Sequence, residues 1–329
     1  SLSVGSIGEM PKAGRDYPGT WPAFQRWFAD DDACRAFLAG LRWPDGFVCP
    51  ACGGVDAWET AAGRWMCSSC GRQTSVTAGT IFHRTRTPLT VWFSAMWFVC
   101  GSKNGTSARS LQQMLGFGSY ETAWAMLHKL RRAMVNPDRD LLGGPGVAVE
   151  MDETIVGGRS KGMSGPRMDN KGRVVIAVER QHPKGLGRVR MRHISAETAR
   201  DDVLDFAADV IADGTIVWTD GATHYNLLAD TVDIVHEQIS MVHADDPAHV
   251  VLPAVHRVAS LLKRWLAGTL HHGQSFEHLD YYLDEFTFRF NRRMSRSRGL
   301  LFYRLAQNAV AIEPHPLKTL TATHRGDLS

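Results

Sequence analysis

Two cysteine pairs of identical spacing most strongly constrain how this chain can fold. Cys49 and Cys52 form one C-x-x-C-G motif, and Cys67 and Cys70 form a second, with fourteen residues between Cys52 and Cys67. The two thiolates of each motif can reach one tetrahedral cation, and the glycine that follows tolerates the tight turn. Four sulfur ligands therefore predict one structural Zn²⁺ and a zinc ribbon over residues 46–82. Unrelated turns or disulfides are the alternatives, which this spacing disfavours.

The length and composition are those of a globular chain of two or three domains. The chain has 329 residues, of which 44% are hydrophobic, and a net charge of +3, which neither requires nor excludes a nucleic-acid partner. Its longest apolar run, 89–100, is shorter than the roughly 20 residues that span a membrane, and we read no secretory signal. Six cysteines are too few for a disulfide scaffold, and Cys34 and Cys100 are expected to be buried. We therefore expect a cytoplasmic protein without a membrane partner.

A helix-turn-helix pattern follows the ribbon. Residues 107–115 and 120–134 predict two helices joined by the short glycine-containing turn 116–119. The second helix has an apolar stripe, and its basic residues fall outside that stripe, which is typical of a DNA-reading helix. An ordinary helical hairpin with a solvated basic face is an equally good reading of the pattern. The DNA-binding candidates on this helix are Trp124, His128, Lys129, Arg131 and Arg132.

Beyond a glycine-rich boundary at 143–146 the pattern changes to strands and predicts an α/β domain with a mixed sheet. Two predicted apolar strands each end in an acid, Asp152 and Asp220. If the strands are neighbours, the two carboxylates converge and repel unless a cation lies between them. Such hard oxygen ligands suit Mg²⁺ or Mn²⁺, and two such ions can promote phosphodiester cleavage. The alternative, that each Asp caps the turn after its strand, is favoured by the spacing alone.

Two further basic segments follow. The helix predicted at 253–267 carries His256 and Lys263, which lie two turns apart on one side. Taken alone, they are better explained as a boundary histidine and a solvated lysine. The acid-free segment 286–312 mixes arginines with aromatic residues, a combination that suits a phosphate backbone and stacked bases, although a solvated helix end explains it nearly as well.

These motifs, in this order, resemble the transposases of the IS1595 group (ISXO2-like) of bacterial insertion sequences. The resemblance extends over about residues 21–307. It rests on CPACG at 49–53, GRQTSVTAGTIF at 71–82, TAWAMLH at 122–128, EMDET at 150–154, VGG at 156–158, LPAVHRV at 252–258, KRW at 263–265 and FRFNRR at 288–293.

The resemblance implies an RNase H-like catalytic core of the DDE type, in which the first and fourth strands are adjacent. Asp152 then matches the first catalytic acid, Asp220 the second, and His256 the variable third position, with Lys263 as the basic residue beyond it. The two acids and His256 are expected to hold two Mg²⁺ or Mn²⁺ ions. Glu285 and Glu153 are possible substitute carboxylates that rank below His256.

The activity implied is binding of terminal inverted repeats of double-stranded DNA, followed by metal-dependent cleavage and strand transfer by at least a homodimer. Basic residues expected to contact DNA in the catalytic region are Arg257, Arg264, Arg289, Arg292 and Arg293. A non-catalytic DNA-binding protein derived from a transposase is the alternative, and a structure-selective nuclease is a third possibility. The work would take place in the bacterial nucleoid.

The expected domain organisation is an α/β chain with a DNA-binding N-terminal half. A helical segment at 1–45 precedes the ribbon, and the helix-turn-helix region occupies 83–140. The RNase H-like domain is expected at 146–312, and a C-terminal tail at 313–329.

Overall fold

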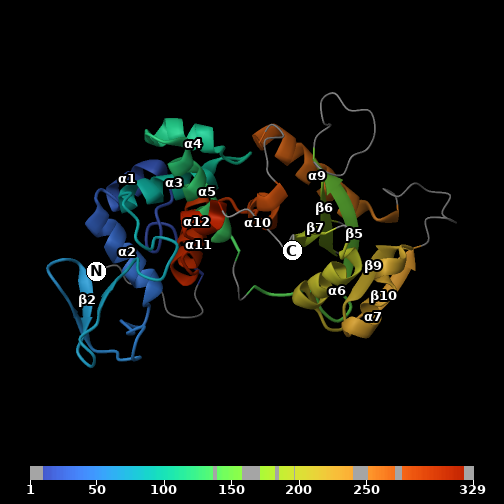
Figure 1. Ribbon diagram of the computed structural model, residues 1–329, viewed down its shortest axis with the longest axis horizontal. Coiled ribbons are helices and arrows are strands. Elements are labelled where there is room, and N and C mark those ends of the chain that lie inside the picture. Colours follow the sequence, from blue (N-terminus) through green and yellow to red (C-terminus); the bar gives the residue numbers. More distant parts are fainter. Residues whose placement is uncertain are drawn as a thin grey trace, which may run out of the picture. The chain divides into compact units, whose positions relative to one another are not determined.

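The computed structural model divides the chain into two compact units (Figure 1). The first unit combines Ser1–Asn136 with Met294–Ser329, and the second unit is Pro137–Arg293. The structure describes residues 10–135, 139–157, 171–181, 185–195, 197–239, 251–270 and 276–321.

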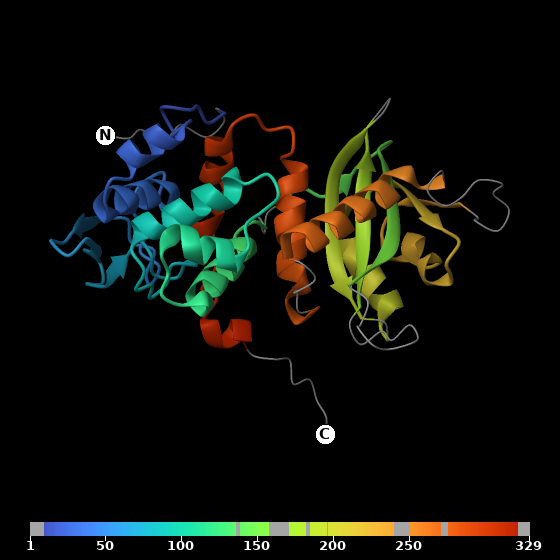
Figure 2. The same ribbon diagram turned by 90° about the horizontal axis from the view of Figure 1, so that it is seen from above.

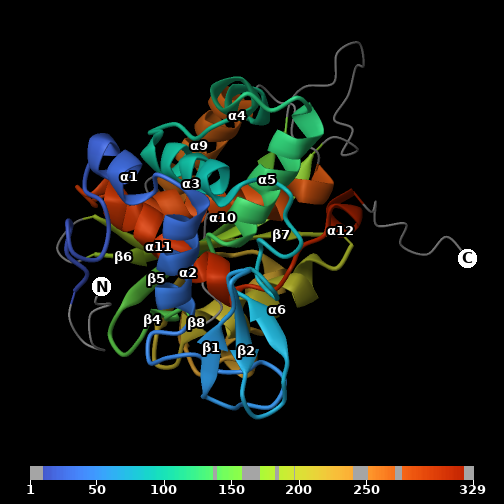
Figure 3. The same cartoon turned by 90° about the vertical axis from the view of Figure 1, so that its left-hand side faces the viewer.

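The first unit is helical apart from the zinc ribbon. Its helix α11 packs against α2 and α3, which lie together in Figure 3. Its helices are α1 (Trp21–Trp27), α2 (Asp31–Arg42), α3 (Leu89–Gly101), α4 (Ala108–Leu115), α5 (Tyr120–Arg132), α11 (Arg298–Ala311) and α12 (Leu317–Thr321).

Aromatic rings hold the core of the first unit together. Phe302 of α11 is fully buried, and its ring centroid lies 5.4 Å from Phe24, 5.5 Å from Phe28 and 5.5 Å from Phe93. Tilted and edge-to-face rings at these distances attract one another beyond the effect of burial. A segment nearly 200 residues downstream of α3 therefore completes the core that α1 to α3 begin.

The close approach of α11 requires a glycine. A Cβ placed on Gly299 would lie 1.9 Å from the carbonyl oxygen of Pro18, so no other residue fits there without movement of the backbone.

This packing divides the C-terminal part of the chain differently from the expected boundary. The sequence assigns 146–312 to one catalytic domain and 313–329 to a tail, whereas α11 and α12 belong to the first unit. The physical reason is the apolar face of α11, which is buried among the aromatic residues of α1 to α3. The arginine-rich and aromatic segment 286–312 therefore spans both units.

The predicted helix pair is present in the first unit. Ser107 caps α4, Gly116 ends it in a left-handed conformation with φ of 68°, and Ser119 caps α5. These are the positions at which serine and glycine are favoured, which explains why 107–115 and 120–134 were recognisable from the sequence.

The N-terminus of α3 is capped by a residue distant in the sequence. The carboxylate of Asp31 accepts hydrogen bonds from the backbone N–H of Leu89 (3.1 Å) and of Thr90 (3.0 Å). Burial raises the pKa of Asp31, but the hydrogen bonds from Thr90 and Leu89 outweigh it and lower that pKa below its ordinary value. Asp31 thus connects the start of α2 to the start of α3.

Within the described residues, a five-stranded sheet of order β10-β9-β5-β6-β7 forms the centre of the second unit. β5 is antiparallel to β6, and β6 to β7, whereas β9 is parallel to both β5 and β10. The strands are β5 (Ala148–Val156), β6 (Gly172–Arg180), β7 (Leu186–Ile194), β9 (Ile216–Asp220) and β10 (Val235–Ile239).

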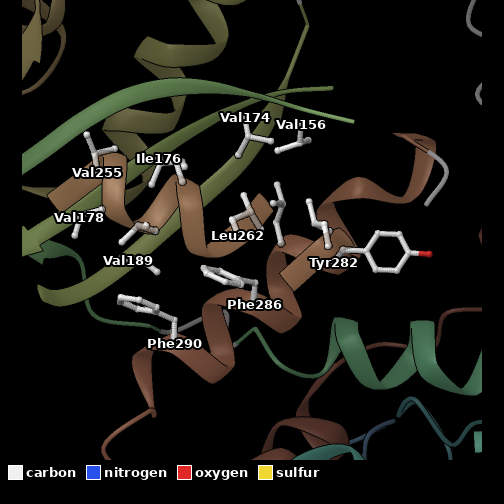
Figure 4. Close-up of a cluster of buried hydrophobic side chains, with 14 of the residues drawn as sticks. Val156, Val174, Ile176, Val178, Val189, Val255, Leu262, Tyr282, Phe286 and Phe290 are labelled. Atoms are coloured by element: carbon white, nitrogen blue, oxygen red, sulfur yellow. The ribbon is translucent and has the colours of Figure 1, made fainter. Parts of the chain in front are cut away.

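Helices cover both faces of this sheet (Figures 1 and 2). On one face, α9 and α10 bury an apolar cluster in which Val255 and Leu262 meet Ile176 and Val178 of β6 (Figure 4). On the other face, α6 and α7 pack with Val149 and other residues of the sheet. The remaining elements are β4 (Leu142–Gly143), α6 (Ala199–Val210), β8 (Ile211–Ala212), η2 (Thr223–Tyr225), α7 (Leu228–Thr231), α9 (Pro253–Leu270), η3 (Phe276–His278) and α10 (Leu279–Asn291).

Three boundaries differ from the sequence prediction. β5 continues past Asp152 to Val156, because its last residues still pair with β6. The segment 143–146, expected to be a domain boundary, begins with the last residue of the short strand β4, which pairs with β8. The helix α9 continues through Gly268 to Leu270, since an isolated glycine weakens a helix without ending it.

No helix in the described part of the chain is both long and apolar enough to cross a membrane.

The cap at Asp31 leads to a stability prediction. Asp31→Ala should lower the free energy of unfolding by about 1–2 kcal/mol, because two backbone N–H groups lose their partner. Urea denaturation followed by tryptophan fluorescence measures this change. Asp32→Ala is the matched control, because Asp32 lies beside it in α2 with a largely exposed side chain paired to Arg35. An equal loss in both variants would contradict the assigned cap.

Candidate functional site

The four cysteines of the two motifs converge on one point. Their sulfur atoms all lie within 4.8 Å of one another, with Cys49 Sγ 3.7 Å from Cys70 Sγ and Cys52 Sγ 3.7 Å from Cys67 Sγ. This convergence argues against two unrelated turns. The cysteines are also not disulfide-bonded, since the sulfurs of a disulfide lie about 2.05 Å apart. Four thiol ligands in this arrangement fit a structural Zn²⁺.

The backbone around the cysteines favours thiolates. A hydrogen bond from the backbone N–H of Ala51 lowers the pKa of Cys49, and one from Cys70 lowers the pKa of Cys67 to about 6. The glycines after the two motifs have φ of 72° and 68°, the left-handed turn that their sequence predicted. At Cys52 a backbone hydrogen bond from Gly54 also lowers the pKa, but the neighbouring cysteine sulfurs raise it to about 12, so a bound cation is needed for all four to act as thiolate ligands.

The ribbon has little apolar core of its own. Within it the described sheet is β1 (Ala57–Glu59), β2 (Arg64–Cys67) and β3 (Gln73–Ser75). The rings of Phe47 and Trp65 stack at 5.6 Å, and Trp43, at the end of α2, completes a small cluster with them. A core of this size does not hold a fold alone, so the ribbon depends on its metal.

The two acids that the sequence singled out lie on adjacent parallel strands. Ala148 of β5 lies opposite Ile216 of β9, and Asp152 and Asp220 each lie four residues further along their strands. The two aspartates therefore reach the same level of the sheet. Both line one pocket of about 260 Å³ at the end of β9.

The electrostatics of Asp152 reflect this neighbour. Burial is the largest effect that raises the pKa of Asp152, to about 6, and the negative charges of Asp220 and Glu153 raise it further. A hydrogen bond from the backbone N–H of Glu153 to Asp152 Oδ1 (2.7 Å) opposes the rise. A second carboxylate close to Asp152 in a shared pocket favours a bound cation, which relieves the repulsion between the two charges.

His256 lies beside the first of these acids. Its Nδ1 atom is 3.8 Å from Asp152 Oδ2. The start of α9 is held over β5 by the buried Glu150, whose Oε2 accepts hydrogen bonds from the backbone N–H of Ala254 and Val255. The helix thus presents His256 to the face of the sheet on which Asp152 lies.

Glu153 and its partners line the same pocket from the opposite face of the sheet. Glu153 Oε2 accepts a hydrogen bond from Arg173 Nη1 (3.0 Å), and Glu153 Oε1 lies 2.5 Å from His224 Nε2. The hydroxyl of Tyr225 donates to the same carboxylate at 3.4 Å. Glu153 points away from the α9 face, as alternation along a strand predicts, and its partners hold it there.

Sequence reasoning missed several of these residues. Glu150 has a signal in retrospect, since it is an acid inside an apolar strand two residues before Asp152 and therefore on the same face. Arg173, His224 and Tyr225 have no local signal, because only the sheet and the turn after Asp220 bring them to the pocket.

The predicted basic residues of α9 lie on its surface. Arg257, Lys263 and Arg264 are exposed, and Lys263 is two turns beyond His256 on the same side of the helix.

The predicted basic residues in and directly after α10 are engaged within the protein. Arg289 Nη2 lies 2.7 Å from Glu285 Oε1, so Glu285, which is 1% exposed, is held in an ion pair within the protein. The guanidinium of Arg292 lies over the ring of Phe288 at 4.2 Å. Arg293 donates to the backbone oxygen of Gly187 at 3.2 Å.

The structure corrects the exposed face predicted for α5. The sequence places His128 and Arg131 outside the apolar stripe, but they are 0% and 2% exposed. The buried side of α5 is wider than its apolar residues indicate, and the imidazole of His128 contacts the ring of Trp124 at 4.1 Å. Arg132 is exposed, and Lys129 is half-buried.

Comparison with known families identifies the class of protein. Residues 141–291 match the ISXO2-like transposase domain, and residues 29–73 match the transposase zinc-ribbon domain. The two domains define a transposase of an insertion sequence, a class that cuts and transfers DNA. The chain thus carries an ISXO2-like transposase domain and a transposase zinc-ribbon domain, as its motifs predicted, and its four-cysteine cluster lies in the ribbon match.

A relative of similar length supports this assignment. The chain is 29% identical to an uncharacterized protein in transposable element ISH50 of Halobacterium salinarum, over 83% of this chain and 94% of the relative. Among solved structures, a chain of the simian T-cell lymphotropic virus intasome in complex with PP2A regulatory subunit B56 gamma matches at 15% identity. That match covers 55% of this chain and 64% of the other, with a TM-score of 0.27, and carries no argument here.

The zinc site gives a prediction on metal content. Cys52→Ser should reduce bound zinc from one ion per chain to none, because three sulfurs no longer close a structural site. The ribbon should then become sensitive to protease, since its aromatic cluster is small. Atomic absorption and limited proteolysis measure the two effects. Cys34→Ala should keep its zinc; retained zinc in Cys52→Ser would contradict the site.

The raised pKa of Asp152 gives a prediction on pH. The folded chain binds this proton more tightly than the unfolded chain, whose carboxyl titrates near 3.8. The free energy of unfolding contributed by Asp152 therefore falls as pH rises from about 4 to about 6 and stays low above.

Asp152→Asn removes this dependence. Without added divalent ions other than zinc, the variant should gain free energy of unfolding relative to the wild type by about 1–3 kcal/mol between pH 4 and pH 7. Urea denaturation over this pH range measures the difference. The exposed Asp201→Asn should keep the wild-type profile. A difference between Asp152→Asn and wild type that does not change with pH contradicts the assignment.

Proposed function

We propose that this chain is a DNA transposase that binds the terminal inverted repeats of its element and performs metal-dependent cleavage and strand transfer. One observation carries the proposal: Asp152 and Asp220 lie at the same level of adjacent parallel strands and share a pocket. We further propose that the second unit is an RNase H-like core of the DDE type. Its support is the sheet, in which the first strand, β5, lies beside the fourth, β9.

The donor atoms of the pocket fit Mg²⁺ or Mn²⁺. Asp152 and Asp220 offer hard carboxylate oxygens, and their mutual repulsion favours a cation between them. When bound, two such ions supply Lewis-acid activation of an attacking oxygen and stabilisation of a leaving oxygen. His256, beside Asp152, is proposed as the third member of the site, where its imidazole completes the ligand set, contacts a phosphate or accepts a proton.

The reaction has two in-line steps. A water molecule attacks the phosphodiester at the element end, the bond to the 3′ oxygen breaks, and a 3′-hydroxyl remains. That hydroxyl attacks a phosphodiester of the target, and the target's own 3′ oxygen leaves. Lys263, exposed on the His256 side of α9, would neutralise a phosphate of the bound strand.

We assign recognition of the terminal repeats to the first unit. The pair α4–α5 is proposed as a helix-turn-helix with Trp124, Lys129 and Arg132 as its accessible contacts, and the zinc ribbon of the same unit as a second recognition element. Arg257 and Arg264 of α9 would contact the phosphate backbone near the catalytic pocket. Joining two element ends to one target implies at least a homodimer on DNA, acting in the nucleoid.

Replacement of either aspartate tests the proposed chemistry. Asp152→Asn and Asp220→Asn should each reduce Mg²⁺-dependent cleavage of an element-end duplex by at least about 10³-fold, because one carboxylate cannot hold the catalytic ions. A gel assay of 3′-end release measures cleavage, and strand transfer is read from joined products. Asp201→Asn, an exposed acid of the same unit, is the matched control.

Each outcome of this assay has a defined meaning. Full cleavage by both aspartate variants removes the mechanism. Sequence-specific binding by a wild-type chain that never cuts supports the non-catalytic alternative, and cutting without joining supports a nuclease. His256→Ala should lose cleavage while its affinity for DNA is kept; wild-type activity in that variant would remove His256 from the site.

A further inference from the structure

A fully buried carboxylate lies next to the proposed catalytic pair. Glu150 is 0% exposed and belongs to β5, two residues before Asp152. Alternate residues of a strand share a face, so both side chains point toward α9. A buried carboxylate is strongly unfavourable unless it is paired and hydrogen-bonded, so its partners explain its presence.

The partners of Glu150 come from two other elements. Its Oε2 accepts hydrogen bonds from the backbone N–H of Ala254 (2.7 Å) and Val255 (2.9 Å), and its Oε1 accepts one from Arg180 Nη1 (2.5 Å). α9 begins at Pro253, so these two N–H groups belong to the first turn, which lacks acceptors within the helix. A carboxylate also complements the positive end of a helix.

Arg180 connects this contact to the neighbouring strand. Its guanidinium lies 5.9 Å from the ring centroid of Trp218, two residues before Asp220 on β9. The ion pair balances the charge of Glu150, whereas the Arg180 side chain remains 33% exposed. Glu150 is thus held by β6 on one side and holds α9 on the other.

The position of His256 depends on this attachment. His256 follows Val255 directly in α9, and its Nδ1 lies 3.8 Å from Asp152 Oδ2. A shift of the first turn by one residue would rotate the helix by about 100° and remove the imidazole from the carboxylate.

We propose that Glu150 is a positioning residue that fixes the first turn of α9 on β5 and thereby sets His256 against Asp152. Because Glu150 is completely buried, it acts through α9 and touches neither DNA nor a metal ion. The effect on the reaction rests on the proposed function, whereas the attachment of α9 does not.

The chain offers a matched control for this proposal. Glu179 is another buried, ion-paired acid of the same unit: its carboxylate lies 2.5 Å from Arg188 and accepts the backbone N–H of Gly143. These contacts are with β4 and β7 rather than with α9. A general loss of stability should appear in variants at both positions, and a loss of α9 attachment only at Glu150.

Hydrogen exchange at Ala254 and Val255 measures the attachment directly. In the full zinc-bound chain, Glu150→Ala should raise exchange of these two amides at least about tenfold relative to the rest of the second unit. Glu150→Gln, which nearly keeps the volume and one acceptor oxygen, should raise it by a smaller factor and remains usable if the alanine variant does not fold. Glu179→Gln should leave these amides as in the wild type.

The same variants are compared in the cleavage assay. Glu150→Gln should lower kcat by at least about tenfold with KM for DNA unchanged within about twofold, whereas Glu179→Gln should keep kcat. Wild-type exchange at Ala254 and Val255 in both Glu150 variants overturns the attachment. An equal loss of kcat in Glu179→Gln overturns the positioning role, since stability alone would then explain it. A wild-type chain that does not cleave DNA removes the proposed function and leaves the exchange result to decide the attachment.

Discussion

The parallel pairing of β5 with β9 is the interaction on which the rest of the second unit depends. It brings Asp152 and Asp220 to one level of the sheet although 68 residues separate them. Burial raises the pKa of Asp152, and the charge of Asp220 raises it further, so the two carboxylates are unfavourable in one pocket without a cation. This concentration of negative charge is the feature of the second unit that supports the proposed metal site.

Features that depend on neighbouring residues were predictable from the sequence. The four cysteines and the glycines after them define their site within 23 residues, so spacing alone predicted the ribbon. The serine caps and glycine stop of α4 and α5 are similarly local. Asp152 and Asp220 needed the resemblance to a family as well, because apolar strands that end in acids occur for ordinary turns too.

Features that depend on distant contacts were not predictable. Asp31 caps a helix 58 residues away, and Glu150 caps one 104 residues away, so neither has a pattern in its own segment. The prediction that His128 and Arg131 lie on the exposed face of α5 was wrong, because the elements that cover a helix decide how wide its buried side is. The boundary between the two units also differs from the predicted domain boundary, because the ring of Phe302 packs against rings from the N-terminal part of the chain.

The central claim is that Asp152 and Asp220 jointly hold a divalent cation. Anomalous diffraction from crystals of the protein soaked in Mn²⁺ locates the ion without reference to activity. We predict a manganese peak in contact with carboxylate oxygens of both residues, and its loss in crystals of Asp220→Asn. Manganese bound elsewhere, with the two carboxylates turned away from each other, would contradict the account.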